Sequence, residues 1–211
     1  MRDIFEIKDY WESAHAIEHL DSLSGCGYKE TIDFMQVTDI LKGRDKVLEI
    51  GVGLGYVTKG FYDRGFMITA LDISEVALER VSQYCENNYL VSEMEQMPDD
   101  YFDVIICHNG IQHIPTFLLE VELKHVIRSL KKGGIFALEF ISSPLAEDTG
   151  LNPDSFIGLG LDSNIGCYCR TPEVMTSLIA KHGGYVCSVI QDYRADIARS
   201  EEHTSELQSL S

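Results

Sequence analysis

Gly51, Gly53 and Gly55 follow an apolar run in the segment VLEIGVGLGYVT, on alternate positions where a strand would give way to a helix. Glycine adopts left-handed backbone conformations and has no side chain, so such a turn brings main-chain N–H groups close to a ligand. The segment lacks the Lys-Ser/Thr pair of a phosphate-binding loop, and its G-x-G-x-G spacing is not the G-x-G-x-x-G of dinucleotide-binding turns. Tight packing of a strand against a helix is the alternative interpretation of the glycines.

Carboxylates accompany the glycines. Glu49 lies two residues before Gly51, Asp72 closes the next apolar run, and Glu93 ends the one after that. Because the carboxyl ends of parallel strands meet at one sheet edge, we expect these acids to gather beside the glycines, where a carboxylate can accept the hydroxyls of a ribose. Acids so placed favour a cationic ligand over a phosphate. Alternatively, Asp72 caps the following helix and Glu93 is a solvated surface residue.

A third group of polar residues follows the apolar run FDVIIC: His108, Asn109 and, in NGIQHIP, His113. An imidazole at a sheet edge can act as a general base, and His113 is the candidate for that role. The alternative is a structural histidine that fixes the loop before Pro115.

Alternating apolar runs and amphipathic patterns predict the elements that position these residues. Strands are expected at 46–50, 67–72, 89–93, 102–108, 135–141 and 185–193, and helices at 9–21, 28–42, 55–64, 74–88, 117–134 and 171–184. Continuous apolar strands that alternate with helices predict an α/β fold: a Rossmann-like, doubly wound, mostly parallel sheet with helices on both faces.

The chain is expected to form one domain over residues 1–198, since 211 residues suit a single core. Within it we distinguish an N-terminal helical cap (1–44), a ligand-binding half (45–141), an aperiodic insert rich in Gly, Pro, Asp and Ser (142–171), and a C-terminal helix and strand (172–198). An insert of this length is too long for a simple connection and is expected to be a lid or a substrate wall.

Residues 199–211 break the pattern of the chain. The segment RSEEHTSELQS is polar and aperiodic, and its reverse translation reproduces a common sequencing-library adapter. We therefore expect a non-native tail after about Ala198, to be set aside like a fusion scar; a natural disordered tail is the alternative.

Composition narrows the function classes. A net charge of −17 repels phosphate backbones and anionic lipid, which disfavours a nucleic-acid or membrane partner. The N-terminus has no apolar signal segment and no apolar run reaches the length of a membrane span, so a cytoplasmic protein is expected. Cys167 and Cys169 lack a second ligand pair, and we expect no metal site.

The motifs LEIGVGLG, ALDIS, SEMEQMP and FDVIICHNGIQHI, in this order, resemble those of class I S-adenosylmethionine-dependent methyltransferases, in the small-molecule group of type 11/12-like domains. The resemblance covers residues 28–141 well and extends loosely to about 193. It implies S-adenosyl-L-methionine as the cofactor. It also implies a seventh, antiparallel strand beside the sixth; no apolar run after residue 198 supplies one, so we expect that strand to be missing.

The resemblance also assigns roles by position. For the methionine end it implies contacts with Glu49, with the backbone of Gly51, Gly53 and Gly55, and with His108 and Asn109. For the nucleoside it implies that Asp72 holds the ribose hydroxyls and that Ile73 packs on the adenine. Glu93 would face the adenine amino group in place of the family's usual Asp, and Met94 would offer its backbone N–H.

The expected reaction is in-line methyl transfer to oxygen or nitrogen of a small-molecule acceptor. Phe140, Phe156 and Tyr168 are candidates for the wall of the acceptor pocket. Tyr10, Trp11 and Tyr28 either close over the cofactor or pack in the core. Two other functions stay open: a catalytically inactive cofactor-binding or assembly subunit of the same fold, and a NAD-dependent oxidoreductase.

Overall fold

The computed structural model describes residues 4–16, 41–142, 156–158, 166–168, 170–192 and 203–210. Its helices are α1 (Ile4–Ala16), α3 (Tyr56–Tyr62), α4 (Glu75–Val81), α5 (Thr116–Ser129) and α7 (Pro172–Lys181), with short 3-10 turns η2 (Ser82–Tyr84), η3 (Val91–Gln96) and η4 (Ile111–His113). Its strands are β1 (Lys46–Ile50), β2 (Met67–Asp72), β3 (Asn87–Leu90), β4 (Phe102–Cys107), β5 (Leu130–Ser142), β6 (Phe156–Gly158), β7 (Gly166–Tyr168), β8 (Tyr185–Asp192) and β9 (His203–Leu210).

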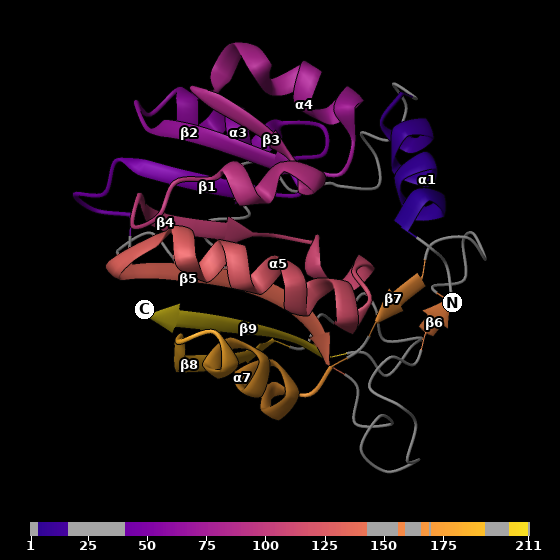
Figure 1. Ribbon diagram of the computed structural model, residues 1–211, viewed down its shortest axis with the longest axis vertical. Helices are drawn as coiled ribbons and strands as arrows, with labels where there is room; N and C mark the ends of the chain where they lie inside the picture. Colours follow the sequence, from indigo (N-terminus) through magenta and orange to yellow (C-terminus); the bar gives the residue numbers. More distant parts are fainter. Residues whose placement is uncertain are drawn as a thin grey trace.

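The main sheet has the order β3-β2-β1-β4-β5-β9-β8, and its first five strands are parallel (Figure 1). The chain runs outward from β1 through β2 to β3 and then returns to place β4 on the other side of β1. Such a reversal opens a crevice outside the carboxyl ends of the two central strands, which is where open α/β sheets bind their ligands. The expected Rossmann-like class is confirmed, and this rule predicts a ligand-binding crevice beyond Ile50 and Cys107.

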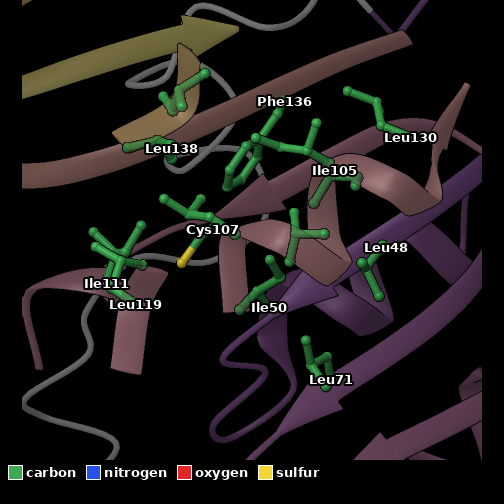
Figure 2. Packing of buried hydrophobic residues seen from close by; sticks show 14 of the residues in the cluster. Leu48, Ile50, Leu71, Ile105, Cys107, Ile111, Leu119, Leu130, Phe136 and Leu138 are labelled. Carbon is green, nitrogen blue, oxygen red and sulfur yellow. The ribbon is translucent and has the colours of Figure 1, made fainter. Parts of the chain in front are cut away.

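Both faces of the sheet are covered because successive side chains on each strand point to opposite faces. On β4, Ile105 and Cys107 belong to the large cluster under α5 and α7, whereas Val104 and Ile106 pack with residues of α3. Figure 1 shows α5 and α7 on one face, and Figure 2 shows Cys107 among apolar side chains from β1, β5 and α5. Burial on both sides thus explains why the run FDVIIC is apolar except for Asp103, which is half-buried.

Several element boundaries differ from the sequence-based expectation. The helix expected over 74–88 ends at Val81, because Asn87–Leu90 pair with Thr69–Asp72 of β2 and backbone pairing outweighs weak helical preference in this stretch. Strand β5 begins at Leu130 rather than 135, where Leu130 pairs with Phe102 ahead of a register shift. The helix expected over 28–42 lies outside the described residues except for Leu41 and Lys42, which are in a turn.

The seventh strand, expected to be missing, is present in the structure, and that expectation is wrong. β9 runs antiparallel between β5 and β8, with Ile135 opposite Leu210 and Ser142 opposite His203. The physical reason is that β5 and β8 each present a row of backbone N–H and C=O groups, which an extended segment can pair with whatever its side chains are. The absence of an apolar run therefore does not exclude a strand here.

The described parts of the insert form a hairpin, with Phe156 opposite Tyr168. Tyr168 is buried, but Phe140 is fully buried in the cluster under α5 and α7, so it belongs to the core and not to a pocket wall. Within the described ranges, no helix combines the length and apolar character needed to cross a membrane.

Candidate functional site

The glycine-containing turn joins β1 to α3 at the crevice. Gly51, Gly53 and Gly55 all have positive φ, at +73°, +50° and +84°. At Gly55 a Cβ would lie 2.6 Å from Cγ1 of Val81 on α4, so the turn packs directly on that helix. Gly53 needs its left-handed backbone to direct its N–H toward β2. The turn over residues 51–55 is therefore formed by main-chain atoms, and we call it the cradle. Side chains in place of its glycines would not permit this shape.

Asp72, the last residue of β2, connects this cradle to the next helix. Its Oδ2 accepts a hydrogen bond from the N–H of Gly53 at 3.2 Å, and its Oδ1 accepts one from the N–H of Ser74 at 2.9 Å. The side chain is buried, and burial raises the pKa of Asp72 although these donors oppose it. Each carboxylate oxygen keeps acceptor capacity for a ligand hydroxyl. Asp72 can therefore accept the N–H of Ser74 at the start of the next helix and a ligand hydroxyl at the same time.

Glu49 lies beneath the turn, on the face of the sheet covered by α3. Its Oε2 accepts a hydrogen bond from the hydroxyl of Thr58 at 2.8 Å. Burial raises the pKa of Glu49 to about 8, despite the Thr58 hydrogen bond and with further help from the charge of Asp72. A cationic group placed beside Glu49 would reverse this shift, because an opposite charge favours the carboxylate form.

Helix α1 lies across the carboxyl ends of the central strands, near α4 (Figure 1). Glu12 caps α4 from outside that helix: its carboxylate accepts the N–H groups of Glu75 at 2.8 Å and Val76 at 3.2 Å and the hydroxyl of Ser74 at 3.0 Å. These groups stand directly after Asp72, so α1 is anchored at the ribose-binding position suggested by the sequence.

Aromatic contacts extend α1 toward the β4 end of the crevice. Trp11 stacks on His15, with ring centroids 5.4 Å apart, and meets the ring of His113 edge-on at 5.0 Å. Nε2 of His15 lies 3.8 Å from the position of a Cβ on Gly53, and burial lowers the pKa of His15. Trp11 thus contacts the candidate base; Tyr10 packs edge-on against Trp11, and Tyr28 lies outside the described residues.

His108 and Asn109 follow β4 directly. Nδ1 of His108 lies 2.6 Å from Oε2 of Glu139 on β5, and Nε2 of His108 lies 3.0 Å from Nδ2 of Asn109. Oδ1 of Asn109 in turn accepts a hydrogen bond from Nε2 of Gln112 at 3.4 Å. Asn109 has φ of +54°, a conformation that asparagine tolerates better than most residues. Four polar side chains therefore form a connected chain at this edge.

The residues expected to contact the nucleoside include Ile73, Glu93 and Met94. Glu93 lies in η3 rather than at the end of a strand, and its Oε2 accepts the N–H of Leu90 at 3.0 Å. Met94 is buried in the core cluster, and Ile73 is half-buried beside Asp72. The guanidinium of Arg128 on α5 holds η3 in place through the carbonyls of Met94 at 3.3 Å and Met97 at 2.9 Å.

Several residues that sequence reasoning missed support the site from other elements: Glu12, His15, Thr58, Arg128, Glu139 and Arg170. The fully buried guanidinium of Arg170 donates to the carbonyls of Ile111, Ile114 and Tyr168 and to the hydroxyl of Thr116, which ties the His113 turn to the insert. The signal that could have found Glu139 is a single acid inside the apolar strand IFALEFI, because a buried charge needs a partner.

The fold and the site together define the class of protein. It is a Rossmann-like α/β protein with a glycine cradle after β1 and an acid at the end of β2. The family model for the methyltransferase domain matches residues 48–138, which include both features. The fold and this match agree, over the matched part of the chain, with the class I S-adenosylmethionine-dependent methyltransferases that the motifs resemble.

Individual proteins resemble the chain at low identity. Ubiquinone biosynthesis O-methyltransferase of Rickettsia akari is 26% identical over 103 residues, which are 46% of this chain and 40% of that protein. The chain therefore matches well under half the length of this relative. The solved structure of an S-adenosylmethionine-dependent methyltransferase from Methanosarcina mazei has a TM-score of 0.68 at 14% identity, covering 83% of this chain and 96% of that one.

A second solved structure adds a ligand-bound comparison. The 1,6-didemethyltoxoflavin-N1-methyltransferase of Burkholderia thailandensis, with bound 1,6-didemethyltoxoflavin and S-adenosylhomocysteine, has a TM-score of 0.68 at 16% identity. It covers 100% of this chain and 91% of that protein. At this identity the likeness concerns the fold alone.

Proposed function

We propose that this chain is an S-adenosylmethionine-dependent methyltransferase that methylates oxygen or nitrogen of a small-molecule acceptor. The observation that carries the proposal is the link between Gly53 and Asp72 at 3.2 Å, which places the glycine cradle and a buried acid side by side at the crevice. Both residues lie in the segment matched by the methyltransferase domain model. The relative from Rickettsia akari is named an O-methyltransferase and the solved structure from Burkholderia thailandensis an N-methyltransferase, so the acceptor atom is kept open between the two.

The residues at the crevice fit such a cofactor. Gly51, Gly53 and Gly55 would admit the methionine portion to the backbone, and Asp72 would hold the ribose hydroxyls. Glu49 would face the ammonium group, which suits a buried carboxyl whose pKa is raised to about 8 until a cation arrives. Ile73, Glu93 and Met94 would surround the adenine, with Arg128 holding their turn. His108 and Asn109 would stand beside the methionine portion.

When bound, S-adenosylmethionine supplies a methyl group already activated by the sulfonium charge. The task left to the protein is to align the acceptor with that methyl group and to exclude water, which lowers the entropic barrier of a two-reactant step. Trp11 and His15 on α1 cover the cradle from outside. For a hydroxyl acceptor, the proposed base is His113, which is half-buried at the edge of the crevice.

The role of His113 is tested by substitution. His113→Ala is expected to lower turnover of a hydroxyl acceptor at saturating substrate by 10²–10⁴-fold, the range of general-base catalysis. Unchanged turnover would leave His113 with the structural role suggested by its contact with Trp11. Nitrogen acceptors that are unprotonated at neutral pH are expected to be less sensitive, because their lone pair is free before transfer.

Calorimetric titration separates the proposed function from its alternatives. We expect the chain to bind S-adenosylhomocysteine and not NAD, and Asp72→Ala to weaken that binding at least tenfold. Binding of NAD alone would favour an oxidoreductase. Binding of S-adenosylhomocysteine without turnover of any compound in a broad panel of phenols, catechols, carboxylic acids and amines would favour a cofactor-binding subunit.

A further inference from the structure

His15 lies in the last turn of α1, beside the middle glycine of the cradle. The residue is 7% exposed, and its Nε2 lies 3.8 Å from the position of a Cβ on Gly53. The N–H of Gly53 in turn donates to Oδ2 of Asp72 at 3.2 Å. An imidazole and a carboxylate therefore adjoin the same glycine, one contributed by α1 and the other by β2.

Three contacts hold the imidazole in this position. Nη2 of Arg80 on α4 donates to the main-chain carbonyl of His15 at 3.0 Å, and the indole of Trp11 stacks on the ring with centroids 5.4 Å apart. In the preceding turn of α1, Glu12 accepts the N–H of Glu75 at 2.8 Å. A side chain that is already fixed loses little conformational entropy when a ligand binds, so this ring is suited to a binding contact.

The imidazole has hydrogen-bonding capacity that its neighbours do not use. Nδ1 of His15 is buried and has no hydrogen-bond partner among the described residues. Burial lowers the pKa of His15, although the charge of Asp72 opposes this shift, so the ring is neutral at neutral pH. A neutral imidazole has one N–H donor and one acceptor nitrogen. Because buried polar atoms normally have partners, the unpartnered nitrogen indicates that a ligand supplies one.

The surrounding groups indicate which kind of ligand this is. Asp72 and Glu49 interact through their charges, and Glu12 acts on His15 in the same way, so an anionic ligand is disfavoured here. A vicinal diol suits the pair of side chains better. Its hydroxyls can donate to the carboxylate of Asp72 and can donate to or accept from a neutral imidazole. A ribose carries such a diol.

We propose that the imidazole of His15 and the carboxylate of Asp72 together hold the ribose diol of the cofactor, so that α1 is part of the binding site. This inference rests on the proposed methyltransferase function. It extends that function to a residue outside the segment 48–138, which the domain model matches. The alternative is that His15 only packs α1 onto the cradle.

Calorimetric titration with two ligands separates these roles. The ligands are S-adenosylhomocysteine and its 2′,3′-dideoxy analogue, which lacks both ribose hydroxyls. His15→Phe keeps a flat ring against Trp11 but has no nitrogen. We expect it to weaken binding of S-adenosylhomocysteine about tenfold and to leave the affinity for the analogue within about twofold. Losses of equal size for both ligands would overturn the proposal, because they would show a packing role alone.

Lys8→Met is the matched control on the same helix. It breaks the 2.7 Å pair between Lys8 and Glu75, which joins α1 to α4, and Lys8 lies about two helical turns before His15. We expect this variant to change the affinities for the two ligands by the same factor. A loss confined to S-adenosylhomocysteine would overturn the proposal, since recognition of the hydroxyls would then depend on the seating of α1 and not on His15.

Nitrogen-15 NMR of the histidine rings tests the contact in the unmodified protein, and it decides if His15→Phe does not fold. With each ligand at saturation, we expect S-adenosylhomocysteine to shift the ring signals of His15, assigned by their loss in His15→Gln. The dideoxy analogue should leave them nearly in place. Equal shifts with both ligands, or binding of S-adenosylhomocysteine with unchanged ring signals, would overturn this assignment alone. Absence of S-adenosylhomocysteine binding would contradict the proposed function and this assignment with it.

Discussion

Gly55 and Gly65 have nearly the same left-handed backbone, with φ of +84° and +82°, but different surroundings. A Cβ on Gly55 would lie 2.6 Å from Val81, whereas nothing lies within 4 Å of one on Gly65. The two positions therefore separate backbone strain from the packing of the cradle on α4.

We expect Gly65→Ala to lower the free energy of unfolding by about 1 kcal/mol, the cost of a left-handed alanine. Gly55→Ala should cost about 2–4 kcal/mol, because α4 must move as well, and should weaken binding of S-adenosylhomocysteine. Urea denaturation and calorimetry measure the two effects. Equal losses at both positions would show that the cradle does not depend on contact with α4.

Buried Glu49 gives stability a defined pH dependence. Its pKa is raised from 4.5 to about 8, so its contribution to stability is fully present below pH 4.5 and is lost as pH rises through 8. At 1.36 kcal/mol per pKa unit this amounts to about 5 kcal/mol. Glu49→Gln should therefore raise the free energy of unfolding at pH 8.5 and leave it nearly unchanged at pH 4.5.

Thermal unfolding across this pH range checks the Glu49 prediction. Glu79→Gln on α4 is the control, because Glu79 is exposed and its removal should leave the slope as it was. A slope that survives in Glu49→Gln would assign the pH dependence to another buried acid, of which Glu122, with a pKa also raised to about 8, is the first candidate.

At the residue scale, spacing along the chain predicted the cradle and Asp72 because both follow from the ends of apolar strands. Glu12, Arg170 and Glu139 were missed, since their partners come from distant segments that only the folded sheet brings together. Glu93 shows the converse: its position in the sequence was read as a strand end, but the 3-10 turn directs its carboxylate to Leu90.

At the scale of elements, α5 holds the η3 turn, where we propose that the adenine binds, through Arg128. Its Nη2 donates to the carbonyls of Met94, Glu95 and Met97, and its Nη1 lies 2.6 Å from Asp99. The guanidinium can serve several acceptors at once because its donors form a planar fork, which the ammonium of a lysine does not provide. The η3 turn therefore depends on a helix that precedes β5.

Arg128→Lys keeps the positive charge but loses the planar set of N–H donors of the guanidinium. We expect it to lower the free energy of unfolding by about 1–2 kcal/mol and to weaken S-adenosylhomocysteine binding several-fold, because η3 loosens. Lys181→Met is the control: it breaks the exposed pair with Glu120 on α5 and should cost less than about 1 kcal/mol with no change in binding. Urea titration and calorimetry report both quantities, and a binding loss shared by the two variants would contradict the role given to η3.

Element prediction succeeded where burial dominates the sequence. β1, β2 and β4 are mostly apolar runs, and their positions follow from the local order of residues. The sequence-based ranges of β3 and of the start of β5 were wrong, because these segments contain polar residues or glycines. They are strands because they pair with a neighbouring strand, and the local hydrophobic pattern does not reveal that pairing.

At the scale of the whole molecule, β9 completes the sheet between β5 and β8. Among the described strands β8 pairs with β9 alone, so α7 and β8 are joined to the parallel sheet partly through this segment. Main-chain pairing makes few demands on the residue types, so a polar segment such as residues 203–210 can occupy this position in the sheet.

Removal of residues 199–211 should lower the unfolding midpoint and the free energy of unfolding by a few kcal/mol, at roughly 0.5–1.5 kcal/mol per hydrogen bond lost. It should also promote association through the two freed edges. Affinity for S-adenosylhomocysteine should stay within about threefold, because the cradle and Asp72 lie on β1 and β2, at the other side of the sheet. An unchanged midpoint would show that β9 contributes no stability.

Helix α1 connects both ends of the crevice, since Glu12 holds the start of α4 and Trp11 contacts His113. We expect a ligand seated in the cradle to leave when these contacts part, so that the opening of one helix sets the lifetime of the complex. Trp11 is the sole tryptophan of the chain. The fluorescence of Trp11 should therefore report the rate of that opening in the unmodified protein.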